Sequence, residues 1–358
     1  MKIVFVCRAY VTQRPGGMLH VLQDRAEELV RRGHEVHVLT TSLHAKQRVP
    51  DQLEDLHGVA VHHLLSLTQV YSDGFNAKCV KTIKALRPDM LHLESIPPGP
   101  TAWWLECRDA VSGPVGCTLH GFGLGALLTA WNLYRDGVRG TFGGFEAMAQ
   151  QVAQLENFDR VIAISAHEQM LLRQYYGIPA VRVYNPIHPA FFATELTAPE
   201  PQAPFLCAAV SGKAERNFAL ADAAIRLIPN AQLHVVQAAT REQMPAEYAK
   251  CRGVLLPTRY AQGFDLTLAE AAAVGRSALV TDTGSYAHEV ATLGYTLVPP
   301  TIKVDEFAKI VAEWVPPEPQ QLRTLAAQRF HPAVHCDRWL LAMKGSHDAE
   351  DNVLLYCP

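Results

Sequence analysis

Several features are missing from this sequence of 358 residues, and each absence narrows its possible functions. No run of about 18 apolar residues is present, so we expect no membrane-spanning helix. The short apolar stretch at 3–7 lacks a following small-residue cleavage site, so it predicts a buried strand rather than a signal peptide. The 8 cysteines form no Cys-x₂-Cys pair, which favours reduced thiols in a cytoplasmic protein.

Motifs of several large enzyme classes are also missing. The sequence has no Gly-x-Gly-x-x-Gly fingerprint, no Walker loop and no Gly-x-Ser-x-Gly elbow, which disfavours nicotinamide dehydrogenases, P-loop enzymes and hydrolases. No Asp-x-Asp pair ends a predicted strand, which disfavours a metal-dependent transferase. His331 and His335 have the spacing of helical metal ligands, but Pro332 and the lack of further ligands argue against a metal site.

The composition is that of a globular protein with room for two cores. Hydrophobic residues make up 49% and charged residues 19% of the chain. A net charge of −3 gives no overall attraction to nucleic acid or anionic membrane, although a local basic face remains compatible with it.

Strand and helix patterns alternate along the chain, which predicts an α/β fold with parallel sheets. The proline-rich stretch 186–204 is the best candidate for a linker between two halves. We expect strands at 3–7, 35–40, 59–64, 89–93, 115–119 and 160–164 before the linker, and near 205–210, 232–237, 253–257, 278–282 and 295–298 after it. We expect helices at 18–32, 76–86, 101–111, 145–155, 166–175, 240–250, 265–274, 304–314 and 319–343.

The segment 257–289 carries the most information about function. Gly263 lies in a loop just before the predicted helix 265–274. The N-terminus of such a helix offers free backbone N–H groups and a positive dipole end, so it suits an anion such as a diphosphate. Glu270 lies within the first turns of this helix, where a carboxylate can reach a sugar or ribose hydroxyl. The segment therefore predicts a site for an anion joined to a sugar.

Two further segments place glycine or positive charge after a predicted strand. Gly16 and Gly17 precede a long helix, where backbone can approach a phosphate closely; a plain turn is the alternative. Lys213 and Arg216 follow the first strand of the second half, where two cations can stabilise a departing diphosphate; a solvated turn is the alternative.

His120 and the glycine-rich segment after it are candidates for the same site. His120 follows a strand, where an imidazole can bind a sugar hydroxyl or polarise a reacting group, although a single histidine is more often structural. Residues 121–144 suit a flap that stacks on a sugar or base; a helix at 124–135 packed into the core is the alternative. The acceptor-binding candidates in this segment are Trp131, Tyr134 and Arg135.

These motifs resemble those of the retaining family-four glycosyltransferases. The segment 257–289 is similar to the Glu-x₇-Glu donor-sugar motif of that family, with Glu270 at the second Glu and Gln262 in place of the first. The loop 14–17 and His120 are similar to the glycine loop and the strand-end histidine of the family. Lys213 and Arg216 resemble its Arg…Lys-Asn phosphate motif, with the order swapped and a shorter spacing.

The resemblance implies the GT-B fold, in which two Rossmann-like domains with doubly wound parallel sheets face a central cleft. It places an acceptor-side domain at 1–188 and a donor-side domain at 189–315. Residues 316–358 would form C-terminal helices that cross back toward the first domain, followed by a frayed tail.

The resemblance also implies transfer of a sugar from a UDP- or GDP-sugar with retention of configuration, without a metal ion or prosthetic group. The acceptor stays open among a small molecule, a glycan, a lipid-linked sugar and a nucleic-acid base. The residues implied in catalysis are His120, Lys213, Arg216 and Gln262, and those implied in donor binding are Gly16, Gly17, Gly263, Phe264, Asp265, Leu266 and Glu270.

Two departures from the family pattern bear on activity. Gln262 can hydrogen-bond hydroxyls but supplies no negative charge near a developing oxocarbenium ion, so donor choice or rate should differ, or activity could be lost. Only one short helix is expected within 237–254, where the family has an additional strand and helix near the nucleobase. A sugar-nucleotide epimerase of the GT-B fold and a catalytically silent sugar-nucleotide-binding protein are the alternatives.

Overall fold

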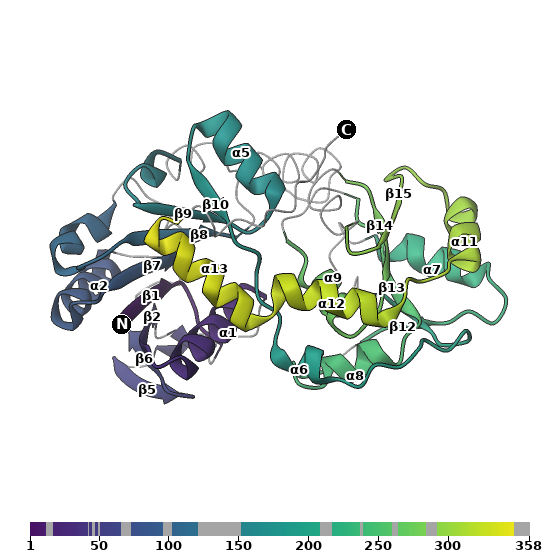
Figure 1. Ribbon diagram of the computed structural model, residues 1–358, viewed down its shortest axis with the longest axis horizontal. Helices are drawn as coiled ribbons and strands as arrows, with labels where there is room; N and C mark the ends of the chain where they lie inside the picture. Colours follow the sequence, from purple (N-terminus) through teal and green to yellow (C-terminus); the bar gives the residue numbers. More distant parts are fainter. Residues whose placement is uncertain are drawn as a thin grey trace. The chain divides into compact units, whose positions relative to one another are not determined.

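The computed structural model describes two compact units, each built on its own parallel sheet (Figure 1). The first unit contains the described residues up to 120, then 152–186 and 335–346, and the second contains those within 187–334. The chain therefore returns to the first unit within its last described helix. The described residues are 1–11, 17–41, 43–44, 47–48, 51–65, 73–95, 102–120, 152–207, 217–236, 239–259, 264–283 and 292–346.

The sheet of the first unit contains eight strands among the described residues, in the order β10-β9-β8-β7-β1-β2-β6-β5. Neighbouring strands run parallel except β5 and β6, which form an antiparallel edge. The strands are β1 (Lys2–Cys7), β2 (Glu35–Thr41), β5 (Gln52–Leu56), β6 (Val59–Leu64), β7 (Met90–Glu94), β8 (Val115–Leu119), β9 (Arg160–Ala163) and β10 (Ala180–Arg182). A separate antiparallel pair is formed by β3 (Leu43–His44) and β4 (Gln47–Arg48).

Helices cover both faces of this sheet, which explains why its central strands β1, β7 and β8 are buried along nearly their whole length. Ile3 and Phe5 of β1 belong to a core shared with α1 (Gly17–Arg31) and α13 (Pro332–Lys344). Val4 and Val6 point to the opposite face, because side chains alternate along a strand. They belong to a second core, shared with α2 (Asp73–Leu86), the 3₁₀ helix η1 (Trp103–Ala110) and α5 (Ala166–Tyr176).

The second unit has a smaller sheet in the order β12-β11-β13-β14-β15, parallel throughout among the described strands. Its core joins the strands to α7 (Phe218–Arg226) and α11 (Val304–Glu313). The strands are β11 (Phe205–Cys207), β12 (Leu233–His234), β13 (Gly253–Leu256), β14 (Ala278–Thr281) and β15 (Thr296–Val298). The other helices are α6 (Pro189–Ala193), α8 (Met244–Ala249), α9 (Leu266–Ala273) and α12 (Pro319–Phe330).

A buried arginine connects separate segments of the second unit. Arg276 lies between α9 and β14 and is 1% exposed. Its guanidinium donates to the carbonyl oxygens of Cys251 (2.7 Å), Thr197 (2.8 Å) and Ala249 (2.7 Å), and to the hydroxyl of Thr197 (3.0 Å). Burial lowers the pKa of Arg276. The guanidinium thus supplies hydrogen-bond donors to carbonyl groups at the C-terminal end of α8 and in the segment that follows α6.

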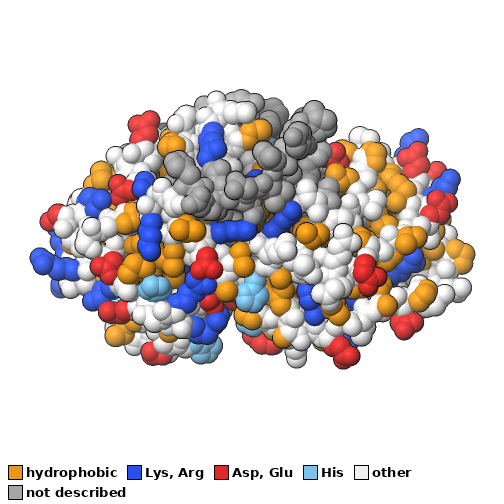
Figure 2. Space-filling view, viewed as in Figure 1, with side chains coloured by type: hydrophobic (Ala, Val, Ile, Leu, Met, Phe, Trp, Pro, Cys, Tyr) orange, Lys and Arg blue, Asp and Glu red, His pale blue; other side chains and the backbone are white. Residues whose placement is uncertain are grey.

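The molecular surface carries both signs of charge. On the face drawn in Figure 2, Lys and Arg side chains are interspersed with Asp and Glu, in keeping with the net charge of −3. Within the described part of the chain, no helix is both long and apolar enough to cross a membrane.

The predicted α/β fold with two parallel sheets is confirmed. Two element predictions were wrong in detail: residues 103–110 form a 3₁₀ rather than an α-helix, and the helix expected over 319–343 is two helices. Pro332 explains the break, because proline lacks an N–H and forces the preceding His331 into extended backbone (ψ 135°). The predicted domain limits at 188 and 315 stay predictions. The predicted helix 124–135 and most of 145–155 lie outside the described residues.

Candidate active site

In the second unit, α9 is the next described helix along the chain after β13. Its N-cap is Asp265, whose carboxylate accepts a hydrogen bond from the backbone N–H of Thr267 at 3.0 Å. Phe264, just before the cap, packs edge-on against Phe330 of α12, with ring centroids 5.5 Å apart. Leu266 is the first helical residue and is half-buried. The helix start that the sequence predicts to bind an anion is thus fixed by a cap and an aromatic contact.

Glu270 lies in the first turns of α9, and its carboxylate accepts a hydrogen bond from the hydroxyl of Tyr248 at 2.8 Å. Tyr248 belongs to α8 and is 1% exposed, so this bond joins the two helices. Burial raises the pKa of Glu270 to about 7, although the Tyr248 hydrogen bond and the charge of Arg241 act in the opposite direction. Carboxylates with such a raised pKa concentrate at functional sites.

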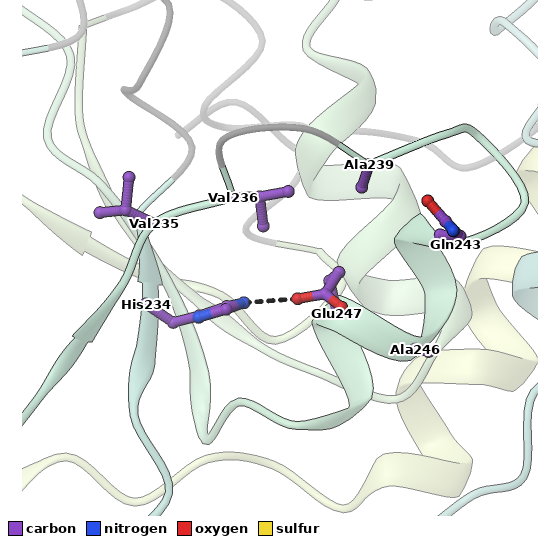
Figure 3. A pocket seen from close by; sticks show the side chains of 7 residues that line it. All are labelled: His234, Val235, Val236, Ala239, Gln243, Ala246 and Glu247. Atoms are coloured by element: carbon purple, nitrogen blue, oxygen red, sulfur yellow. Dashed lines mark hydrogen bonds and ion pairs between the residues drawn. The ribbon is translucent and has the colours of Figure 1, made fainter.

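A pocket of 620 Å³ lies beside α8, at the carboxyl end of β12 (Figure 3). Within its lining, His234 Nε2 and Glu247 Oε2 are 2.7 Å apart. Hydrogen bonds from Lys250 and His234 lower the pKa of Glu247, so its carboxylate is ionised at neutral pH. Glu247 and Tyr248 are consecutive in α8, so this one helix both lines the pocket and carries the hydrogen-bond donor to Glu270. The rest of the lining is Val235, Val236, Ala239, Gln243 and Ala246.

In the first unit, His120 follows the last residue of β8 at the carboxyl edge of the sheet. Its Nε2 lies 2.7 Å from Oε2 of Glu94, the last residue of the neighbouring strand β7. Glu94 is fully buried and forms an ion pair with Arg25 of α1. Burial alone would raise the pKa of Glu94, but the Arg25 charge and the His120 hydrogen bond outweigh it and hold the pKa well below its usual range. An ionised carboxylate therefore faces the imidazole.

The remaining predicted site residues divide by whether the structure describes them. Gly17 is exposed and is the first residue of α1, one position before the predicted helix start at 18. The others, Gly16, Trp131, Tyr134, Arg135, Lys213, Arg216, Gln262 and Gly263, lie outside the described residues.

Sequence reasoning missed Tyr248 and Glu94. Glu94 leaves a signal in the sequence, because it is a charge directly after an apolar strand, one position beyond the predicted strand end. Tyr248 leaves none, because its hydrogen bond to Glu270 joins residues 22 positions apart on two helices.

The two histidines with the spacing of helical metal ligands make other contacts. His335 is buried in the first unit and donates from Nδ1 to the carbonyl oxygen of Tyr184 at 2.6 Å. His331 Nδ1 accepts from the backbone N–H of Ala333 at 3.2 Å. In the described ranges, no group of three or more His, Cys, Asp or Glu side chains is arranged to hold a metal ion.

Two family models match successive parts of the chain. Glycosyltransferase Family 4 matches residues 15–191, and glycosyl transferases group 1 matches residues 198–329. Together they span both units. A search of curated proteins finds no match.

Solved structures resemble the chain over nearly its whole length. Sucrose-phosphate synthase from Thermosynechococcus elongatus is 17% identical with a TM-score of 0.63, and the match covers 96% of each chain. HepE from Anabaena, in complex with UDP and glucose, is 15% identical with a TM-score of 0.67, covering 96% of this chain and 100% of HepE. WaaG, a glycosyltransferase involved in lipopolysaccharide biosynthesis, is 13% identical with a TM-score of 0.59, covering 94% and 95%. Identities this low show a shared fold.

Proposed function

Because the chain belongs to the family-four glycosyltransferases of the GT-B fold, we propose that it transfers a sugar from a nucleotide-diphosphate sugar with retention of anomeric configuration. The observation that supports this best is the start of α9. There, the N-terminus of a capped helix and the carboxylate of Glu270 lie within the first turns of one element. The UDP and glucose bound to HepE support a nucleoside-diphosphate sugar as the donor.

The diphosphate would lie at the N-terminus of α9, where the helix dipole attracts an anion. Lys213 and Arg216 would supply positive charge that stabilises the negative charge building on the diphosphate as it departs. The side chain of Gln262 and the backbone of 263–265 would hydrogen-bond the hydroxyls of the donor sugar. With helix and cations neutralising the diphosphate, the proposed transfer needs no metal ion.

Glu270 would accept hydrogen bonds from the ribose hydroxyls, which are donors that an ionised carboxylate can satisfy in pairs. The nucleobase would enter the pocket beside α8, since that helix also positions Glu270 through Tyr248. The volume of 620 Å³ falls within the range of small-molecule sites. His234 and Glu247 would meet the polar edge of the base (Figure 3).

The proposed reaction needs no carboxylate nucleophile. The bond between the anomeric carbon and the diphosphate oxygen breaks, and the acceptor oxygen bonds to the same face of that carbon. The departing phosphate oxygen takes the proton of the acceptor. His120 would hydrogen-bond a hydroxyl of the transferred sugar, and the loop ending at Gly17 would contribute backbone contacts. Trp131, Tyr134 and Arg135 stay candidates for binding the acceptor.

Donor binding is expected to depend on pH through Glu270. Its pKa is raised to about 7, so the carboxylate is mostly protonated at pH 6 and mostly ionised at pH 8. Only the ionised form accepts from both ribose hydroxyls, so the donor should bind about tenfold more tightly at pH 8 than at pH 6. Calorimetric titration with a nucleotide sugar measures this, because its doubly esterified diphosphate does not titrate in that interval. Glu270→Gln should remove the pH dependence; an unchanged dependence in that variant would contradict the assignment.

The function is tested by measuring nucleoside diphosphate release from a panel of UDP-, GDP- and ADP-sugars, each with and without candidate acceptors. Release that an acceptor stimulates, with a product of retained configuration by NMR, is the expected result. Isomerised donor without any acceptor would show an epimerase instead. Binding without turnover would show a silent sugar-nucleotide-binding protein, a result that the absence of a charge at Gln262 would explain.

A further inference from the structure

Four side chains in the first unit form a continuous hydrogen-bonded chain that ends at His120. Arg25 Nε is 2.8 Å from His335 Nε2, Arg25 forms an ion pair with Glu94, and Glu94 Oε2 is 2.7 Å from His120 Nε2. They come from α13, α1, β7 and the residue after β8. We propose that Glu94 is a positioning residue that fixes the protonated nitrogen and the orientation of His120, and that Arg25 and His335 hold Glu94 in place.

His335, at the far end of this hydrogen-bonded series from His120, has one possible protonation pattern. His335 Nδ1 lies 2.6 Å from the carbonyl oxygen of Tyr184, which can only accept, so Nδ1 carries a proton. Burial and the neighbouring Arg25 lower the pKa of His335 well below its usual value, so the ring is neutral. Its Nε2 is therefore an acceptor, and it takes the Nε–H of Arg25. This contact fixes one side of the guanidinium.

The guanidinium is also held from its faces. Arg25 lies over the rings of Phe5, at 5.9 Å, and Trp339, at 5.5 Å, and it is 1% exposed. Its Nη1 donates to Oε1 of Glu94, and its charge keeps that carboxylate ionised. The other imidazole nearby, His92, is 3.7 Å from Glu94 and adds no charge, because burial lowers its pKa to about 3.

An ionised Glu94 determines what His120 can do. A carboxylate is only an acceptor, so the nitrogen facing it, Nε2, must carry the proton. In the neutral ring, Nδ1 is then left as the acceptor, and it suits a sugar hydroxyl that donates a hydrogen bond. The reverse tautomer would place two lone pairs against each other across 2.7 Å. This inference rests on the proposed role of His120 in donor-sugar binding.

The experiment is a double-mutant cycle with Glu94→Gln and His120→Asn, read as kcat/KM for the donor. An amide can donate as well as accept, so Glu94→Gln no longer selects one tautomer of His120. We expect Glu94→Gln to lower kcat/KM about 10- to 100-fold in the parent and to have little further effect in the His120→Asn background. An equal loss in both backgrounds would overturn the proposal, because it would mean that Glu94 does not act through His120.

A second readout does not depend on turnover. Nitrogen-15 NMR of histidine-labelled protein, with the His120 signals assigned by their loss in His120→Asn, should show Nε2 protonated in the parent. It should show the other tautomer populated in Glu94→Gln. A parent spectrum with the proton on Nδ1 would refute the proposal. If no donor turns over at all, the proposed function fails, whereas this spectrum still decides the role of Glu94.

Two controls separate positioning from folding. Arg25→Met combined with Glu94→Met removes both buried charges together, so the fold should survive while kcat/KM falls as in Glu94→Gln. Asp337→Asn removes the charge from the exposed ion pair of Arg32 and Asp337 (2.6 Å), which joins the residue after α1 to α13, and kcat/KM should stay unchanged. A folded double variant with parent kcat/KM would overturn the proposal.

Discussion

Glu270→Ala is expected to abolish measurable donor binding, lowering affinity about 100-fold or more. The carboxylate would accept two ribose hydroxyl hydrogen bonds, and hydrogen bonds to a charged group contribute about 1.5–3 kcal/mol each. Truncation removes both. The measurement is calorimetric titration of the best donor from the panel, with circular dichroism to confirm that the variant folds.

Tyr248→Phe is the matched control for this substitution. It removes the hydroxyl that donates to Glu270 at 2.8 Å but leaves the carboxylate and the ring in place. Donor affinity should fall much less than in Glu270→Ala, because the groups that meet the ribose are unchanged. Normal turnover in Glu270→Ala would refute the placement of the donor site at α9.

Arg276→Met is expected to lower the free energy of unfolding of the second unit by about 1–3 kcal/mol. Methionine fills the space of the buried stem, but the carbonyl groups of Cys251, Thr197 and Ala249 lose their donor. Of these residues Cys251 is buried, whereas Thr197 is exposed and Ala249 is half-buried, so water can reach their carbonyls. Each unsatisfied buried carbonyl costs about 1–3 kcal/mol. Urea unfolding followed by circular dichroism measures the loss.

Arg226→Met provides the comparison at the surface. Arg226 forms an ion pair with Asp222 at 3.0 Å, but its side chain is 76% exposed. Exposed pairs of this kind contribute little, so the change should stay within about 0.5 kcal/mol. Equal effects of the two substitutions would show that the carbonyl contacts of Arg276 carry no particular weight.

The parts of the site that the sequence predicts are those encoded locally. Gly263 and the alanine-rich run to Gly275 mark a loop and a helix within 13 residues, and the structure has α9 at Leu266–Ala273 with Asp265 as its cap. Cap preference and helical propensity both act over such short distances. A helix start and its carboxylate can therefore be located without knowledge of the rest of the fold.

The partners of the site residues could not be predicted in the same way. Arg25 and His335 are separated by 310 positions, and Glu94 meets His120 only because β7 and β8 are neighbours in the sheet. Periodicity predicts that these strands exist but does not give their order. The raised pKa of Glu270 likewise follows from burial by α8, which depends on tertiary packing.

The position of α13 in the first unit determines the order in which the two units can complete their cores during translation. Cys336, Trp339 and Met343 fill the same core as Phe5 and Leu22, although they are among the last described residues to be translated. The second unit contains no segment from after Val334, so it can complete its core earlier. The half of the chain that leaves the ribosome first is therefore finished last, and until then Arg25 lacks the cover of the Trp339 ring.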